Sequence, residues 1–394
     1  MRMWQTKRMR LLDSLLCLTT LFVAAMPGSY AFGQSKSEDK MIPFYIGTYT
    51  GPKSEGIYRS QLDLASGNLA EPQLVAKLDN PSFLTIHPTK PVLYAVSEVR
   101  RGDQRHGAQV MAYRMEADGK LTEIGGQPSA GQGPCYVSTD QTGTVALVAN
   151  YGSGSIASLP INDDGSLAPP ASGIQHEGKS VNPQRQEGPH AHCIISDPSN
   201  EFACAVDLGL DQVLVYKLHH GTGKLEAQPS GNYRAAPGNG PRHLAFHPDG
   251  KHAFVNHEIA SKLSSIRWQA GRFHELETLS TLPTDNADSN STAETLVHPN
   301  GKFVYCSNRG HNSIAIFAFD AAAEKLTVVG HASTLGKTPR NFRIDPTGHY
   351  LLAENQGSDS IVPFRIDPSS GQLTPTGNSI SVGGPCCIKF VLAK

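Results

Sequence analysis

A short motif recurs along this chain at an interval of about 45–55 residues. In most copies a Gly-Pro pair stands just before a short apolar run, as in GPHAH at residues 188–192 and GPRH at residues 240–243. Each repeat unit carries four short strand-like runs, and this combination of period and strands predicts a β-propeller. Six complete units begin at Pro81, Pro134, Pro189, Pro241, Ser291 and Pro339.

Each unit has the pattern of consecutive antiparallel strands. The first apolar run ends at a turn such as HPDG, HPNG or DPTG, where proline presets φ and glycine supplies the positive φ of a tight turn. A second run, a polar cluster such as LGLDQ and an alternating third run such as IAIFAF follow, and the fourth strand begins with KL or QL. No stretch after residue 40 has a convincing amphipathic helical pattern, so the predicted fold class is all-β.

The two ends of the chain each hold part of a seventh unit. The C-terminal segment PCCIKFVLAK supplies only a first strand, whereas the segment that begins PFYIGTYTGPK supplies the second, third and fourth strands. Pairing these pieces closes the ring and removes the exposed edges that an open array would keep. We therefore predict a single domain over residues 41–394, a seven-bladed β-propeller closed by strands from both termini.

Residues 1–31 have the pattern of a secretory signal peptide. The basic segment MRMWQTKRMR precedes the apolar stretch SLLCLTTLFVAAM, and PGSYA offers a cleavage site near Ala31. That stretch is about 13 residues long, whereas a membrane span needs roughly 20, so a membrane anchor is disfavoured. We expect an exported protein that has no membrane span after cleavage, with residues 32–40 as a flexible mature N-terminus.

Charge and cysteine content narrow the class of function. The formal net charge is −1, without the basic surplus that binding to a nucleic-acid backbone needs, so no nucleic-acid partner is expected. After Cys17 leaves with the signal peptide, none of the remaining cysteines has the CxxC spacing of a metal site. We interpret them as buried free thiols on strands, at Cys135, Cys193, Cys204, Cys306, Cys386 and Cys387.

Propeller geometry predicts which residues from distant units meet. The first strand of each blade lies nearest the central channel and the second runs antiparallel beside it, so the start of one and the end of the other emerge at the same face. The units that begin at Pro189, Pro241 and Ser291 have the densest mix of His, Arg and Glu at this mouth. The candidate residues there are His190, His192, Arg242, His243, Glu258, Glu294, Asn308, Arg309 and Arg340.

Structural roles compete with chemical roles at several of these positions. Arg242 and Glu258 lie in one unit, where an ion pair between them would close the hairpin. A histidine such as His192 can also pack beneath a loop. Glu98 and Glu354, at strand ends, are interpreted as solvated charges. The repeated histidines of the HP turns lie at the opposite face and are predicted to be turn residues, namely His87, His247 and His298.

Several motifs together carry a family resemblance over about residues 41–394: YIGTYT, ANYGSGSI, PHAH…DP, GPRH…HPDG, HPNGKFVYCSNRG and PRNF…DPTG. This succession resembles the seven-bladed lactonase family, which includes the propeller-type 6-phosphogluconolactonases and the fungal carboxy-cis,cis-muconate cyclases. The site proposed for that family implies catalytic roles for His192, Arg242, Glu258 and Arg309 in this sequence. The GPHAH turn offers two histidines, so His190 stays an alternative to His192.

These residue types suit the opening of an ester. Hydrolysis of a lactone needs a base that takes a proton from water and cations that hold the oxyanion. We expect His192 or Glu258 to transfer the proton, and Arg242 with Arg309 to hold the anion. The other mouth residues are predicted to bind the substrate: His190, His243, Asn308, Arg340 and Glu294.

The predicted function is hydrolysis of a small, anionic sugar-acid lactone, of the 6-phosphogluconolactonase kind, by a monomer that needs no cofactor. Two alternatives stay open: formation of a lactone from an unsaturated diacid, as the cyclases imply, and non-catalytic binding of a ligand or protein partner. A metal ion at the mouth is disfavoured, because Arg242 and Arg309 would repel a cation and already supply positive charge.

Overall fold

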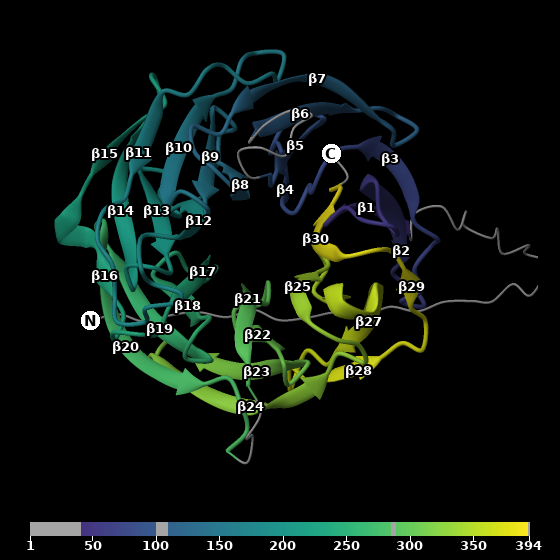
Figure 1. Ribbon diagram of the computed structural model, residues 1–394. Helices are drawn as coiled ribbons and strands as arrows, with labels where there is room; N and C mark the ends of the chain where they lie inside the picture. The colour runs from purple at the N-terminus through teal and green to yellow at the C-terminus, as the bar shows by residue number, and fades with distance from the viewer. Residues whose placement is uncertain (1–40, 100–108, 285–288, 393–394) are drawn as a thin grey trace, which may run out of the picture. The chain divides into compact units, whose positions relative to one another are not determined.

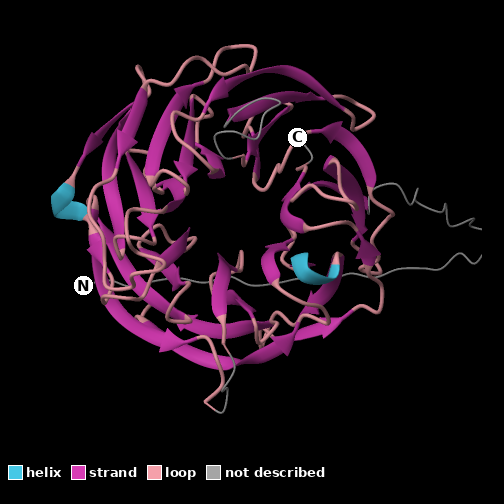
Figure 2. Cartoon of the chain, in the orientation of Figure 1, coloured by secondary structure: helices cyan, strands magenta, loops and turns pink. Residues whose placement is uncertain are grey.

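The computed structural model describes residues 41–99, 109–284 and 289–392, so the predicted signal peptide and flexible N-terminus lie outside the described residues. The described strands form seven antiparallel sheets in a ring around a central channel (Figure 1). Helical structure in the described chain is limited to two short 3₁₀ turns, Pro229–Gly231 and Gln356–Ser358 (Figure 2). This confirms the predicted all-β, seven-bladed propeller.

Six blades are built from successive strands. Blade 1 has β4 (Leu84–Ile86), β5 (Val92–Ser97), β6 (Gln109–Met115) and β7 (Leu121–Pro128). Blade 2 has β8 (Pro134–Thr139), β9 (Val145–Asn150), β10 (Ser155–Pro160) and β11 (Ser172–Gln175). Blade 3 has β12 (Ala191–Ser196), β13 (Phe202–Asp207), β14 (Gln212–His219), β15 (Lys224–Ala227) and β16 (Tyr233–Arg234).

The other three complete blades follow the same order. Blade 4 has β17 (Pro241–Phe246), β18 (His252–His257), β19 (Lys262–Gln269) and β20 (Arg272–Ser280). Blade 5 has β21 (Ser291–Val297), β22 (Phe303–Arg309), β23 (Ser313–Asp320) and β24 (Lys325–Ser333). Blade 6 has β25 (Pro339–Ile344), β26 (Tyr350–Asn355), β27 (Ser360–Ile366), β28 (Leu373–Pro375) and β29 (Ile380–Ser381).

The seventh blade joins the two ends of the described chain. Its inner strand is β30 (Pro385–Phe390), followed outward by β1 (Met41–Thr48), β2 (Gly56–Asp63) and β3 (Gln73–Lys77). Strands β30 and β1 pair antiparallel, with Ile46 opposite Ile388, and both side chains are buried in one cluster with Phe44 and Tyr350. The predicted closure by strands from both termini is confirmed.

The hydrophobic core lies between neighbouring blades. The second strands β5, β9, β18 and β26 are buried at every position, because both faces of each sheet pack against another blade. A strand buried on both faces is apolar along its length instead of alternating, which explains runs such as VLYAVS in β5. The cysteines of the described strands share this environment, and all six of them are buried free thiols, as predicted.

Histidines of the HP turns connect adjacent blades at the face opposite the predicted mouth. The Nε2 atoms of His87, His247 and His298 lie 2.8–2.9 Å from the carbonyl oxygens of Gly143, Gly301 and Gly348 in the next blade. These glycines have positive φ, and a Cβ atom there would come within 3.0 Å of the histidine ring. The prediction that these three histidines are turn residues is confirmed.

No helix in the described part of the chain has the length and apolar character needed to cross a membrane.

Candidate functional site

An irregularity near the start of the inner strands directs side chains toward the channel. In five blades one residue there has no partner on the second strand: Cys135, His192, Arg242, Arg340 and Cys386. In blade 5, Ala293 and Glu294 together oppose Ser307. A β-bulge of this kind removes a residue from the ladder and re-aims its side chain. The five unpaired side chains all line one hollow.

The bulge distinguishes the two histidines of GPHAH. His192 is the bulged residue of β12 and is 5% exposed in the hollow. His190 precedes the strand, its ring stacks on Tyr151 with centroids 4.6 Å apart, and its Nδ1 atom lies 3.1 Å from the Tyr151 carbonyl oxygen. The structure therefore places His192 in the hollow and His190 beside it.

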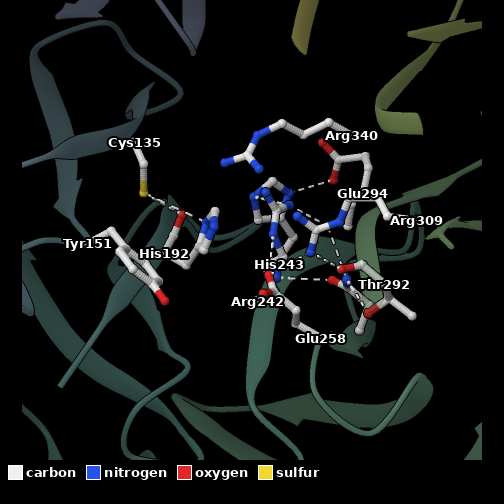
Figure 3. A network of polar contacts seen from close by, with 12 residues as sticks. Cys135, Tyr151, His192, Arg242, His243, Glu258, Thr292, Glu294, Arg309 and Arg340 are labelled. Carbon is white, nitrogen blue, oxygen red and sulfur yellow. Dashed lines mark hydrogen bonds and ion pairs between the residues drawn. The ribbon is translucent and has the colours of Figure 1, made fainter. Parts of the chain in front are cut away.

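The hollow is small, with a volume of about 10 Å³, which is room for about one water molecule. A larger cavity of about 1110 Å³ opens at the other face, among the HP turns. None of the predicted mouth residues lines that larger cavity in the described structure. The reactive residue types converge on the hollow (Figure 3), so the hollow is the better candidate site despite its size.

Glu258 is the centre of a buried charge cluster. Its Oε2 atom lies 2.9 Å from both Arg242 Nε and Arg309 Nη2, and its Oε1 atom lies 2.7 Å from Arg185 Nη2. Burial alone would raise the pKa of Glu258, but Arg309, Arg242 and Arg185 outweigh it and hold that pKa at about 2. Glu258 is therefore ionised at neutral pH and resists protonation.

Arg185 is the member of this cluster that the sequence patterns did not indicate. It lies between β11 and β12 in a long connection, and its side chain is 41% exposed. Besides Glu258, its Nη2 atom contacts the Tyr151 hydroxyl at 3.2 Å. The length of this connection, immediately before GPHAH, is the one sequence signal that could have pointed to it.

A second chain of contacts orients Arg242. His243 Nδ1 lies 2.8 Å from Glu294 Oε1, and Arg242 Nη1 lies 3.1 Å from His243 Nε2. Burial lowers the pKa of His243 to about 4 although Glu294 opposes the shift, so the imidazole is neutral at neutral pH. A neutral ring that donates through Nδ1 to Glu294 leaves Nε2 free to accept from Arg242. His243 and Glu294 therefore hold the Arg242 guanidinium in place.

His192 is a neutral imidazole surrounded by cations. Burial lowers its pKa well below the ordinary value, and Arg242, His243 and Arg340 lower it further. Its Nδ1 atom faces the Cys135 sulfur at 3.7 Å, and its ring meets Tyr151 edge-on at 5.4 Å. Burial raises the pKa of the Cys135 thiol, so this neighbour is uncharged. Among the described residues, Nε2 of His192 has no hydrogen-bond partner.

Arg340 enters the hollow from blade 6. Its Nη2 atom donates to the Tyr49 hydroxyl at 2.8 Å, and that hydroxyl donates to Glu98 Oε2 at 2.7 Å. Glu98 also accepts a hydrogen bond from Ser82. In the described chain no carboxylate oxygen lies within 4.0 Å of the Arg340 guanidinium, unlike those of Arg185, Arg242 and Arg309.

The interpretation of the strand-end glutamates as solvated charges was wrong for Glu354. Glu98 keeps partial exposure to solvent and also accepts hydrogen bonds from Tyr49 and Ser82. Glu354 is fully buried, and neither carboxyl oxygen has a hydrogen-bond partner in the described structure. Burial raises the pKa of Glu354 well above its ordinary value, and Glu294 adds to the shift. Neighbouring blades enclose the end of the Glu354 strand, whereas Glu98 is half-buried.

The structure places Asn308 away from the hollow. The side chain is fully buried in blade 5, where Nδ2 donates to the Thr281 carbonyl oxygen at 2.8 Å. Its Oδ1 atom accepts from the Thr281 hydroxyl at 2.8 Å and from Asn290 at 3.1 Å. Both the nitrogen and the oxygen of the amide make hydrogen bonds within the protein, so Asn308 does not offer the substrate contact that was predicted for it.

Comparison with known proteins agrees with this architecture. The model of the family "Lactonase, 7-bladed beta-propeller" matches residues 43–390. The chain is 39% identical over 350 residues to a 6-phosphogluconolactonase of Bacillus subtilis, covering 88% of this chain and 97% of the relative. A 6-phosphogluconolactonase of Formosa agariphila is 31% identical over 309 residues, which cover 76% of this chain and 86% of the relative.

Solved structures give the same assignment. The periplasmic gluconolactonase of Pseudomonas aeruginosa has a TM-score of 0.85 and 33% identity, covering 90% of this chain and 100% of that one. A putative 6-phosphogluconolactonase from Bacteroides fragilis has a TM-score of 0.84 and 32% identity, covering 91% and 100%. The seven closed blades, the family match over nearly all described strands and the named relatives agree with one another. The chain therefore belongs to the seven-bladed β-propeller lactonase family.

Proposed function

We propose that this protein hydrolyses a small, anionic sugar-acid lactone at the hollow, in the manner of a 6-phosphogluconolactonase. The observation that carries the proposal is that equivalent bulges turn neutral His192 and the guanidinium groups of Arg242 and Arg340 into one hollow. The names of the related 6-phosphogluconolactonases support the substrate class. Each of the seven described blades is complete within one chain, so we propose that the protein acts as a monomer.

In the proposed reaction His192 first accepts a proton from water and later returns it to the leaving group. A water molecule adds to the lactone carbonyl carbon as His192 Nε2 takes its proton. The guanidinium group of Arg242, held by His243 and Glu294, stabilises the oxyanion that forms. The ring C–O bond then breaks, and the His192 imidazolium returns the proton to the leaving alkoxide. The product is the open-chain hydroxy acid.

Glu258 takes a different part in this proposal. A base must present a free acceptor atom to water, whereas both carboxylate oxygens of Glu258 are already paired with arginines, which also hold its pKa at about 2. Its carboxylate instead keeps Arg185, Arg242 and Arg309 close together in a buried place, where guanidinium groups would otherwise repel one another. The cluster keeps a net positive charge, which favours an anionic substrate. His192 is therefore the proposed base.

Replacing the proposed base provides the first test. His192→Gln should lower kcat/KM for 6-phosphogluconolactone by about 100-fold to 10,000-fold, because general-base catalysis contributes that much. His190→Gln is the matched control and should lower it by less than about tenfold, since His190 packs on Tyr151 outside the hollow. Rates come from an acid-release assay corrected for spontaneous hydrolysis. A larger loss in the His190 variant would assign the chemistry to that residue.

The pH profile separates the two candidate bases. His192 acts unprotonated, so activity is lost as pH falls through its pKa, which lies well below 6.5. We expect kcat/KM to stay level between pH 6.5 and pH 8 and to fall only in more acidic buffer. Glu258→Gln should be slower but should keep this acidic limb, whereas His192→Gln should lose it. An acidic limb that disappears in Glu258→Gln would identify Glu258 as the base.

Arg340 is proposed to bind the anionic group of the substrate, because its charge lacks a carboxylate partner. Arg340→Gln should raise KM for 6-phosphogluconolactone by about 10-fold to 100-fold, as expected for a lost hydrogen bond to a charged group. Arg343→Gln, on the same strand but lining the opposite cavity, should leave KM unchanged. Steady-state kinetics with glucono-δ-lactone shows whether Arg340 contacts the phosphate: an equal rise in KM would exclude this.

We also propose that the protein is exported and cleaved near Ala31. The basic and apolar pattern of residues 1–31 supports this, as does the likeness to a periplasmic gluconolactonase. Intact-mass spectrometry of the protein purified from its native host should show a chain that begins within a few residues of Ala31. A chain that retains residues 1–31 would contradict export by cleavage.

A further inference from the structure

A cluster of metal-ligating side chains lies in the HP turn of blade 4, outside the hollow. His247, Asp249 and His252 each offer one ligand atom, and these atoms lie within 4.8 Å of one another. It is the one such group found among the described residues. We infer that these three side chains form a Zn²⁺ site at the face opposite the hollow.

The three side chains converge through one carboxylate. Asp249 Oδ1 lies 3.0 Å from His247 Nδ1, and Asp249 Oδ2 lies 2.7 Å from His252 Nδ1. Ligand atoms around a tetrahedral Zn²⁺ ion are each about 2.0–2.2 Å from the metal. Ligand atoms of a tetrahedral site are therefore about 3.3–3.6 Å apart, so the Asp249 carboxylate must move by several tenths of an ångström away from the rings to admit the ion.

The far nitrogen of each ring is already used as a donor. His247 Nε2 lies 2.8 Å from the Gly301 carbonyl oxygen, which can only accept. His252 Nε2 lies 3.1 Å from Glu324 Oε1. Arg267 donates to both carboxylate oxygens of Glu324, so Glu324 is an acceptor for His252. The Nε2 atom of each ring therefore donates away from Asp249, and the Nδ1 atom of each ring faces Asp249.

This is the arrangement that metal-binding histidines require. A ligating imidazole almost always donates its other N–H to a carboxylate or a backbone carbonyl, which fixes the tautomer and the ring orientation. His252 has the carboxylate of Glu324 and His247 has the carbonyl of Gly301. Phe319 meets both rings edge-on, with centroids 5.5 and 5.1 Å away. The second shell of the site is thus complete before any ion binds.

Asp249 and the two rings need a positive charge between them. The contact between Asp249 Oδ1 and His247 Nδ1 is unfavourable without a cation, because Nδ1 already accepts the Asp249 backbone N–H at 3.2 Å, which leaves two acceptors 3.0 Å apart. An ion bound at Nδ1 replaces that hydrogen bond, because the nitrogen has one lone pair. One divalent cation among the three ligands satisfies the contacts of Asp249 with both rings.

The donor set and its exposure indicate the kind of ion. Two imidazole nitrogens and one carboxylate oxygen suit Zn²⁺ better than Mg²⁺ or Ca²⁺, which take oxygen ligands. His247 and His252 are 8% and 5% exposed, whereas the Asp249 side chain is 27% exposed. The ion would enter past Asp249, and water would complete its coordination.

Blade 5 supplies a natural control for this turn. Residues 247–252 read HPDGKH, and residues 298–303 read HPNGKF. His298 makes the same contacts as His247, with Nε2 2.8 Å from the Gly348 carbonyl and Nδ1 accepting the Asn300 N–H at 3.1 Å. The double substitution Asp249→Asn with His252→Phe converts the blade 4 turn into the blade 5 turn. The fold accepts that turn, so this variant removes two ligands without a foreign structure.

The test is Zn²⁺ binding by the full mature protein after treatment with chelator and dialysis. Isothermal titration with ZnCl₂ at pH 7.5 should show one site per chain in the wild type and in His192→Gln, and no such site in the double variant. Zn²⁺ should raise the melting temperature of the wild type but not that of the double variant. Asp249→Asn alone, which keeps both rings, should weaken Zn²⁺ binding by about tenfold or more.

Lactone hydrolysis gives an independent readout. The double variant and the metal-free wild type should both hydrolyse lactone at the normal rate, because the site lies at the opposite face from the hollow. Equal Zn²⁺ stoichiometry in the wild type and the double variant would overturn the proposal. Failure of the wild type to bind Zn²⁺ at millimolar concentration would also overturn it.

Discussion

The pairing of β30 with β1 closes the ring of blades and thereby sets the position of every inner strand. Residues from opposite ends of the chain, such as Ile46 and Ile388, lie directly across from each other in this pair. Closure completes the seventh blade and holds seven inner strands around one channel. Only then do side chains as distant in sequence as Tyr49 and Arg340 meet in the same hollow.

The bulge near the start of the inner strands turns this ring into a site. A bulge interrupts the ladder whatever its side chain is, so the bulged position can carry Cys135 in one blade and Arg242 in another without a change of fold. The arginines brought together in this way would repel one another without a nearby carboxylate. Glu258 supplies that carboxylate for three arginines, and Arg340, outside that cluster, keeps a charge available for a ligand.

A feature repeated from blade to blade also shapes the face opposite the hollow. The HP-turn histidine joins each of three blades to the next through a glycine carbonyl, and that contact fixes which ring nitrogen carries hydrogen. In blade 4, Asp249 and His252 add two further ligand atoms beside His247. The HP-turn histidine thus serves packing in blades 1 and 5. In blade 4 it serves packing and also contributes to the proposed cation site.

Turn chemistry and apolar runs are local patterns, so they predicted the period, the seven blades, their closure and most of the residues at the mouth. The choice between His190 and His192 needed the three-dimensional structure, since a bulge is a property of two paired strands. Burial by neighbouring blades enclosed Glu354 and used the Asn308 amide, and the fold brought Arg185 to Glu258. These outcomes depend on contacts between residues far apart in the chain, which no local pattern records.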